Sequence, residues 1–329
     1  MPAIKKIFPG GTAVSPLHTL KIILLAEGYR AVDRPQFAAA CSEFVDVLTH
    51  TAPFSLTDLH PTTISVHAGF VASAAAGAAV DAPAIDRTAF DARYETASHR
   101  LTISQAKVNA FVEDPATTLT FGNEALPLID ILRTGDVSMG ATGTIVAVLL
   151  PPIAGEAATA EAESALGEED YYFVACTTNN LWPQVVLRGV GRVMGLGDEW
   201  ELDGDGFLEP ADRRAAAYVN LVYAAEPPTT HDDFHLKWHR YLSVAERIAP
   251  PAVHPKADPA VADHGVDPIP LTPSTIGYWE GGGGYRTKIY RSAHDCLMRR
   301  RVGDSRLPLS AAPVPFCKVC RLHLANLLF

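Results

Sequence analysis

The sequence lacks the features that mark membrane-bound or exported proteins. It contains no apolar run near the roughly 20 residues that a transmembrane helix needs, so we expect no membrane insertion. Lys5 and Lys6 lie near the N-terminus, but no long apolar stretch and no small-residue cleavage site follows them, and the apolar residues 22–26 are too few for a signal core. These absences predict a cytoplasmic protein.

Basic residues are also in short supply. The 329 residues include 27 Lys and Arg against 37 Asp and Glu, which gives a formal net charge of −10. Phosphate groups are bound by clustered Lys and Arg, so this balance argues against a nucleic acid as the main partner and against an anionic membrane surface. Apolar residues make up 48% of the chain, which is enough for a full hydrophobic core.

Cysteine is scarce, with five residues in the chain. Cys41 and Cys176 stand alone, and we expect both to lie in the core as small apolar side chains. The other three lie near the C-terminus: Cys296, Cys317 and Cys320. The C-x-x-C spacing of the last two is typical of metal sites, and with His323 the three cysteines would supply four ligands for a structural zinc ion. Free thiols are the alternative in a cytoplasmic protein, and a disulfide bond is the alternative in a secreted one.

Apolar periodicity predicts alternating strands and helices over residues 1–200. The expected strands are residues 21–26, 63–66, 144–150 and 171–175. The expected helices are residues 35–48, most of 90–111, and 184–196. Residues 154–169 are expected to form a loop or a short surface helix, and residues 201–329 loops and short helices, with a loop at the glycine run 281–284. We expect a single α/β domain over residues 1–329.

The helix expected at residues 184–196 carries the skeleton of a zinc-peptidase helix. Such helices contain H-E-x-x-H, because two histidines four residues apart bind one zinc ion and the glutamate activates the zinc-bound water. Here Arg188 and Arg192 occupy the histidine positions, and Gly189 occupies the glutamate position. Arginine stays protonated and does not ligate zinc, and glycine cannot act as a base. The motif is therefore degenerate, and we expect no catalytic zinc.

Other motifs accompany this helix in a fixed order along the chain. They are Glu27-Gly28-Tyr29, Pro53-Phe54, residues 196–200 (LGDEW), the glycine run 281–284, Tyr290-Arg291, residues 296–299 (CLMR) and residues 316–321 (FCKVCR). In these motifs, residues 20–325 resemble the IgA-peptidase family of zinc metallopeptidases. The resemblance implies a zincin-like α/β fold: a mixed twisted sheet with packed helices and an irregular C-terminal part. It also implies that the catalytic core of the family is lost here.

The two arginines have a physical interpretation of their own. Their guanidinium groups would bring the two positive charges of a zinc ion to one helix face, and they would pair with Asp198 or Glu199, the residual acidic residues of the site. Alternatively, both side chains point to solvent in a decayed cleft. A third interpretation is that Arg188 and Arg192 bind an anionic ligand, a nucleotide or the carboxylate of a partner.

Two further segments have the composition of metal sites. The first resembles an EF-hand calcium loop with the possible ligands Glu201, Asp203, Asp205 and Asp212. An acidic Asp-Gly turn is the alternative, because Glu is unusual at the first position of such a loop. The second is a stripe of histidines at helical spacing, His231, His235 and His239. A solvated helix face is the alternative for this stripe.

The leading functional hypothesis is a catalytically inactive metallopeptidase homologue. It would act as a protein- or peptide-binding scaffold component, alone or within a larger assembly, because a cleft shaped for an extended peptide survives the loss of zinc. One alternative is an active zinc metallopeptidase with relocated ligands such as His231, His235 and Asp198. Another is an anion or nucleotide binder that uses Arg188 and Arg192.

Overall fold

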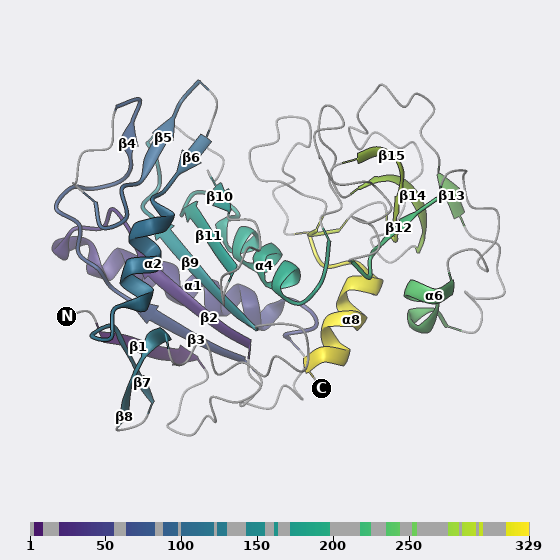
Figure 1. The fold of residues 1–329 in the computed structure, drawn as a ribbon, viewed down its shortest axis with the longest axis horizontal. Helices are drawn as coiled ribbons and strands as arrows, with labels where there is room; N and C mark the ends of the chain where they lie inside the picture. Colours follow the sequence, from purple (N-terminus) through teal and green to yellow (C-terminus); the bar gives the residue numbers. More distant parts are fainter. Residues whose placement is uncertain are drawn as a thin grey trace. The chain divides into compact units, whose positions relative to one another are not determined.

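The protein is described by a computed structural model, shown in Figure 1. The described residues are 3–8, 20–55, 64–82, 88–97, 100–121, 124–129, 143–154, 161–163, 172–197, 218–224, 235–243, 252–254, 276–282, 285–293, 296–298 and 314–328. The chain divides into two compact units, Met1–Val193 and Met194–Phe329. The expectation of a single domain, with an α/β part over residues 1–200 and a loop-rich part over residues 201–329, stays a prediction. Among the described helices, none has both the length and the hydrophobicity to cross a bilayer.

The first unit is built on a mixed sheet of eight strands. Their order is β10 (Glu161–Glu163), β11 (Tyr172–Thr177), β9 (Thr144–Leu150), β2 (Leu20–Ala26), β3 (Ile64–Gly69), β1 (Ala3–Phe8), β7 (Thr118–Phe121) and β8 (Glu124–Pro127). The four strands from β11 to β3 run parallel, whereas β10, β1 and β8 each pair antiparallel with a neighbour. The mixed sheet confirms the α/β class.

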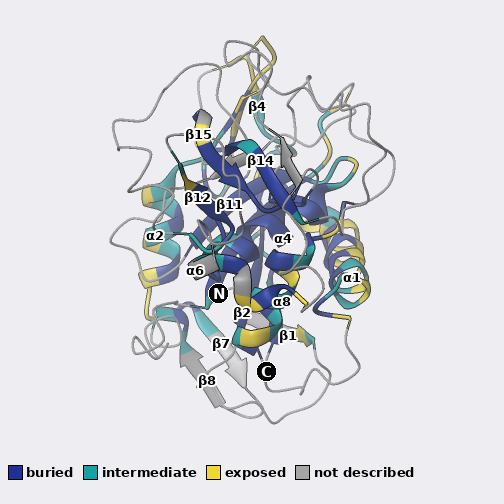
Figure 2. Ribbon diagram, turned by 90° about the vertical axis from the view of Figure 1, so that its right-hand side faces the viewer, coloured by how far each residue is buried: buried dark blue, intermediate teal, exposed yellow. Residues whose placement is uncertain are grey.

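Both faces of this sheet are covered, which explains the continuous apolar runs of its central strands. Helix α2 (Gln105–Glu113) and a small sheet of β4 (Ala79–Val80), β5 (Arg93–Glu95) and β6 (Arg100–Thr102) share one core cluster with the sheet. That cluster includes Ile23, Val146 and Phe173. Figure 2 shows α2 and α1 (Arg34–His50) on opposite sides of the buried strands. Helix α4 (Trp182–Val193) packs against β9, β11 and α1.

Helix α1 forms where the sequence predicted a helix. Pro35 lies in its first turn, where the missing backbone N–H costs nothing. Its apolar side chains, Phe37 to Leu48 at helical spacing, are buried. Cys41 on α1 and Cys176 on β11 are 3% and 0% exposed, which confirms their place in the core.

Two predictions about local structure in this unit are wrong. Residues 90–111 were expected to be mainly helical, but the helix begins at Gln105, and β5 and β6 precede it. Tyr94 and Leu101 are buried between exposed neighbours and pair across the two strands, which is strand periodicity. Residues 161–163, expected in a loop or helix, form β10 because they pair with β11.

The second unit contains a sheet that the sequence did not predict. Its strand order is β12 (Leu221–Tyr223), β15 (Tyr285–Arg291), β14 (Gly277–Gly282) and β13 (Ala252–His254). The described helices of this unit are α6 (His235–Trp238), η3 (His239–Tyr241) and α8 (Lys318–Leu328). The glycine run was expected to be a loop, but Gly281 and Gly282 end strand β14. Gly281, at φ +96°, lies where the pairing with β15 shifts register, and glycine adopts that conformation without strain.

Candidate functional site

Helix α4, which carries the degenerate zinc motif, is part of the core of the first unit. Eleven of its twelve residues are buried, and only Arg192 is half-buried (Figure 2). The ring of Trp182 lies 5.9 Å from that of Phe44 on α1, and its indole Nε1 donates to Glu43 at 3.2 Å. Burial on all sides of a helix is typical of a core element. Helix α4 therefore has a structural role independent of any metal.

Gly189 brings α4 closer to the sheet than any other residue would allow. A Cβ atom at this position would lie 2.6 Å from Cδ1 of Ile145 on β9 and 3.1 Å from Cε1 of Tyr172 on β11. Real Cβ atoms essentially never have contacts under 3.0 Å. Glycine costs an exposed helix about 1 kcal/mol relative to alanine, so its presence here is explained by packing. At the position that corresponds to the glutamate of the H-E-x-x-H motif, side chains of the sheet therefore occupy the space that a side chain would need.

The two arginines of the motif differ in their surroundings. Arg188 is 1% exposed, so the interpretation in which both arginines point to solvent is wrong for this residue. The half-buried Arg192 donates through Nη1 to the hydroxyl of Tyr172, and its guanidinium carbon lies 5.9 Å from the centre of that ring. Arg188 thus belongs to the packed interior of the unit, and Arg192 lies at its edge against Tyr172. Asp198 and Glu199 lie outside the described residues, so their pairing with the arginines stays a prediction.

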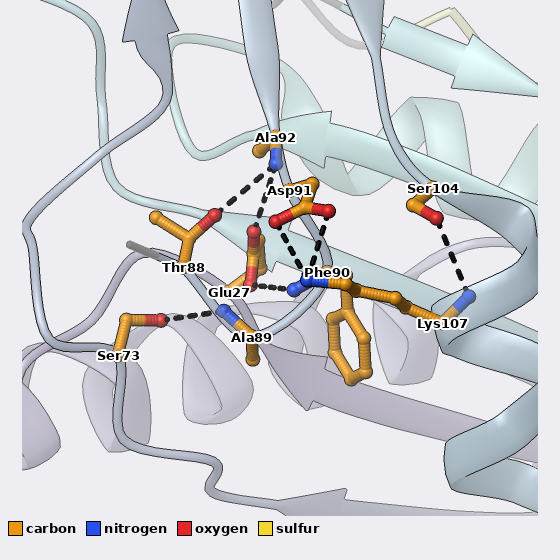
Figure 3. A network of polar contacts seen from close by, with 9 residues as sticks. All are labelled: Glu27, Ser73, Thr88, Ala89, Phe90, Asp91, Ala92, Ser104 and Lys107. Carbon is orange, nitrogen blue, oxygen red and sulfur yellow. Dashed lines mark hydrogen bonds and ion pairs between the residues drawn. The ribbon is translucent and has the colours of Figure 1, made fainter. Parts of the chain in front are cut away.

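A buried carboxylate lies at the end of the neighbouring strand β2, and sequence reasoning missed its role. Glu27 is 0% exposed. Its two carboxylate oxygens accept hydrogen bonds from the backbone N–H groups of Phe90 at 2.9 Å and Ala92 at 3.1 Å (Figure 3). Burial raises the pKa of Glu27, and the hydrogen bonds from Thr88, Phe90 and Ala92 oppose that rise. Glu27 therefore fixes the loop that leads into β5. The signal in the sequence was a charged residue directly after a fully buried strand.

The same loop is held by further contacts that Figure 3 shows around Glu27. Lys107 on α2 pairs with Asp91 at 2.8 Å, and the Ser73 hydroxyl accepts from the backbone N–H of Ala89 at 3.3 Å. The Ser73 hydroxyl also accepts from the N–H of Gly28 at 2.9 Å. Glu27 belongs to this network because both of its carboxylate oxygens accept hydrogen bonds from backbone N–H groups. We therefore assign Glu27 a structural role.

The chain that follows α4 is fixed by a buried asparagine of the second unit. The helix ends at Val193, earlier than the expected residue 196, and Gly195, at φ +83°, adopts the left-handed conformation that glycine favours after a helix. Asn220 is 0% exposed, and its side-chain amide accepts from the N–H of Gly197 and donates to the C=O of Gly197, both at 2.8 Å. A Cβ atom at Gly197 would lie 2.6 Å from the ring of Tyr218, so the approach requires glycine.

Replacing Asn220 tests this anchor. Asn220→Ala leaves a buried N–H and a buried C=O of Gly197 without their partner, and we expect a loss of about 2–4 kcal/mol in the free energy of unfolding, measured by urea denaturation. Asn220→Asp retains the acceptor but places a carboxylate against the carbonyl of Gly197, so it should cost at least as much at neutral pH. A loss under about 0.5 kcal/mol in both variants would contradict the anchor.

Most of the remaining predicted metal ligands cannot be placed. The calcium-loop residues lie outside the described residues: Glu201, Asp203, Asp205 and Asp212. His231 also lies outside them. His235 and His239 begin α6 and η3, and their side chains are not described. The calcium site and the histidine stripe therefore stay predictions.

Three predicted zinc ligands of the second unit do come together. The Sγ atoms of Cys296, Cys317 and Cys320 all lie within 4.8 Å of one another, and the three residues are buried. Cys296 follows β15, and Cys317 and Cys320 flank and enter the first turn of α8. The structure therefore has a buried group of three thiols that could hold a metal ion.

His323, the fourth predicted ligand, does not belong to this group. Its Nε2 lies 2.9 Å from the C=O of Met194, and its Nδ1 lies 3.0 Å from the hydroxyl of Tyr241. Burial lowers the pKa of His323, and the Met194 carbonyl opposes that shift. Both ring nitrogens are used in these contacts, so the prediction that His323 completes the cysteine site is wrong.

Comparison with known proteins does not identify a family. No protein-family model matches the chain, and no curated protein matches it.

Proposed function

We propose that this chain is a catalytically inactive homologue of the zinc metallopeptidases of the IgA-peptidase family, with a zincin-like first unit, and that it acts as a protein- or peptide-binding scaffold component. The observation that carries the proposal is the filled glutamate position on α4. Gly189 packs against Ile145 and Tyr172 and leaves no volume for a general base. Without the base and both imidazole ligands, neither zinc binding nor water activation remains at this helix.

The arginines support the same proposal. Arg188 is buried, and Arg192 is hydrogen-bonded to Tyr172 and lies over its ring. Recognition of a phosphate or carboxylate group requires guanidinium donors that are open to the ligand. The packing of α4 therefore favours a scaffold role over an anion or nucleotide site at Arg188 and Arg192.

The edge of the large sheet offers a means of binding an extended peptide. Strand β10 is the last strand on one side and runs antiparallel to β11. Within the described part of the chain, β11 is the one strand hydrogen-bonded to β10, although β6 lies close by. A sheet edge presents unpaired backbone groups, and peptides bind such edges by strand addition. We therefore expect the partner to contribute an extended segment.

Proteolysis assays test the loss of catalysis. The purified protein is expected not to cleave casein or a peptide library, with or without a chelator. Chelator-sensitive cleavage would refute the proposal and would favour an active zinc metallopeptidase with relocated ligands. That alternative draws on Asp198, His231 and His235, whose side chains are not described.

Hydrogen exchange tests the binding surface. Peptides selected from a random display library are expected to slow amide exchange at residues 161–163 several-fold, because strand addition would pair backbone groups on the side of β10 that faces away from β11. The amides of α2 serve as a control and should keep their exchange rates. Protection that spares residues 161–163 would exclude the β10 edge as the binding surface.

A further inference from the structure

The three buried thiols of the second unit have the separation that a metal ion requires. The Sγ atoms of Cys296 and Cys320 lie 3.8 Å apart, and all three sulfur atoms lie within 4.8 Å of one another. A Zn–S bond is about 2.3 Å long, so two thiolates at a tetrahedral angle are separated by about 3.8 Å. A disulfide bond would require the two sulfur atoms to approach to about 2.05 Å. The separation therefore fits zinc coordination better than a disulfide.

Donors around the sulfur atoms favour thiolates, the form in which cysteine binds metal. The backbone N–H of Cys317 donates to Sγ of Cys296 at 3.3 Å, and the hydroxyl of Ser292 lies 3.5 Å from Sγ of Cys317. Cys317 also directly precedes α8, and its backbone C=O accepts a hydrogen bond from the N–H of Arg321 in the first turn of that helix. The helix dipole therefore stabilises negative charge at this end. Such outer hydrogen bonds orient and tune the ligands of metal sites.

Thiolates in this group need a compensating positive charge. All three cysteines are buried, and an uncompensated buried charge is costly. A divalent ion at the three sulfur atoms supplies that charge.

We propose that Cys296, Cys317 and Cys320 bind a structural zinc ion as three thiolate ligands. A fourth donor, from water or a further side chain, completes the tetrahedron, and the displaced S–H protons pass to solvent. The ion ties the segment after β15 to the first turn of α8, where the N–H of Leu297 already donates to the C=O of Pro315 at 3.0 Å. This site is independent of α4 and of the proposed binding function.

Elemental analysis of the purified full-length protein tests the site. We expect one zinc ion per chain in the wild-type protein prepared under reducing conditions. Cys317→Ser and Cys320→Ser should each lower zinc occupancy by more than about tenfold after dialysis against a weak chelator. Cys41→Ser and Cys176→Ser, at buried cysteines outside the group, should leave it unchanged. A protein without zinc, or zinc retained in both cluster variants, would overturn the proposal.

Cobalt binding to the wild-type protein keeps the test decisive if the variants fail to fold. Replacement of zinc by Co²⁺ is expected to produce sulfur-to-metal charge-transfer absorption, and chelation should expose three additional thiols to alkylation at the cluster positions in mass spectrometry. Absence of that absorption, or a chain mass lower by two hydrogens with Cys296, Cys317 or Cys320 in a disulfide, would overturn zinc ligation. Neither measurement depends on peptidase activity, so its failure is distinguishable from failure of the proposed function.

Discussion

Restoring the complete zinc motif with Arg188→His, Gly189→Glu and Arg192→His is expected to unfold the protein and not to create a peptidase. A Cβ atom at residue 189 already lies 2.6 Å from Ile145. Overpacking by a few atoms costs about 1–3 kcal/mol, and a buried unpaired carboxylate adds several kcal/mol. The sum is a large part of the roughly 5–15 kcal/mol that stabilises a typical domain. Urea denaturation with and without zinc measures the effect.

Controls separate the steric effect from the loss of arginines. The variant with Arg188→His and Arg192→His retains Gly189, and it should be more stable than the triple variant by at least about 3 kcal/mol. Gly189→Ala should cost about 1–3 kcal/mol alone and less in an Ile145→Val background, because valine lacks the Cδ1 atom that the new Cβ would meet. A stabilising Gly189→Ala, as seen at exposed helix positions, would show that the contact is not limiting.

Replacing Glu27 is expected to have the second large effect. Glu27→Ala leaves the backbone N–H groups of Phe90 and Ala92 without their acceptor, and each unsatisfied buried donor costs about 1–3 kcal/mol. We expect a loss of about 2–4 kcal/mol in the free energy of unfolding, since removal of the buried charge offsets part of the penalty. Urea denaturation measures the loss, and Glu113→Ala, at an exposed position on α2, should change stability by less than about 0.5 kcal/mol.

The pH dependence of stability provides a separate measure of Glu27. Burial raises its pKa above the ordinary value of 4.5, so the folded protein holds the proton more tightly than the unfolded chain. As pH rises from 4.5 through the raised pKa, this group therefore lowers the stability of the wild-type protein. Glu27→Gln lacks this titration, so its stability relative to wild type should improve over the same interval. A difference between the two proteins that does not vary with pH would contradict a raised pKa.

Local patterns predicted the central strands and two of the helices. Long apolar runs make up most of β2, β9 and β11, because both faces of these strands are buried. The spacing of buried side chains in α1 follows the helical period, and the core positions of Cys41 and Cys176 followed from their isolation. These features depend on interactions between neighbours in sequence, which a sequence displays directly.

Features that depend on distant pairing could not be predicted. Strand β10 has the sequence EAE, which has no apolar alternation, and it exists through its pairing with β11. The acceptors of Glu27 bind N–H groups 63 and 65 residues further along the chain. From the sequence, Gly189 indicated only that a catalytic base is missing. The structure adds that a side chain at this position would collide with Ile145. The three thiols were grouped correctly, but His323 instead contacts Met194 and Tyr241, which are distant in sequence.

All five cysteine thiols are buried, so their reaction with an alkylating reagent depends on local opening of the structure. Cys41 and Cys176 lie in the first unit, and the other three cysteines lie in the second. Burial raises the pKa of Cys41 to about 12, so its thiol is protonated and shielded from alkylating reagents until the unit opens. Pulsed alkylation of Cys41 and Cys176 with mass spectrometry therefore reports opening of the first unit, whereas alkylation of the other three cysteines also reports release of the proposed zinc ion.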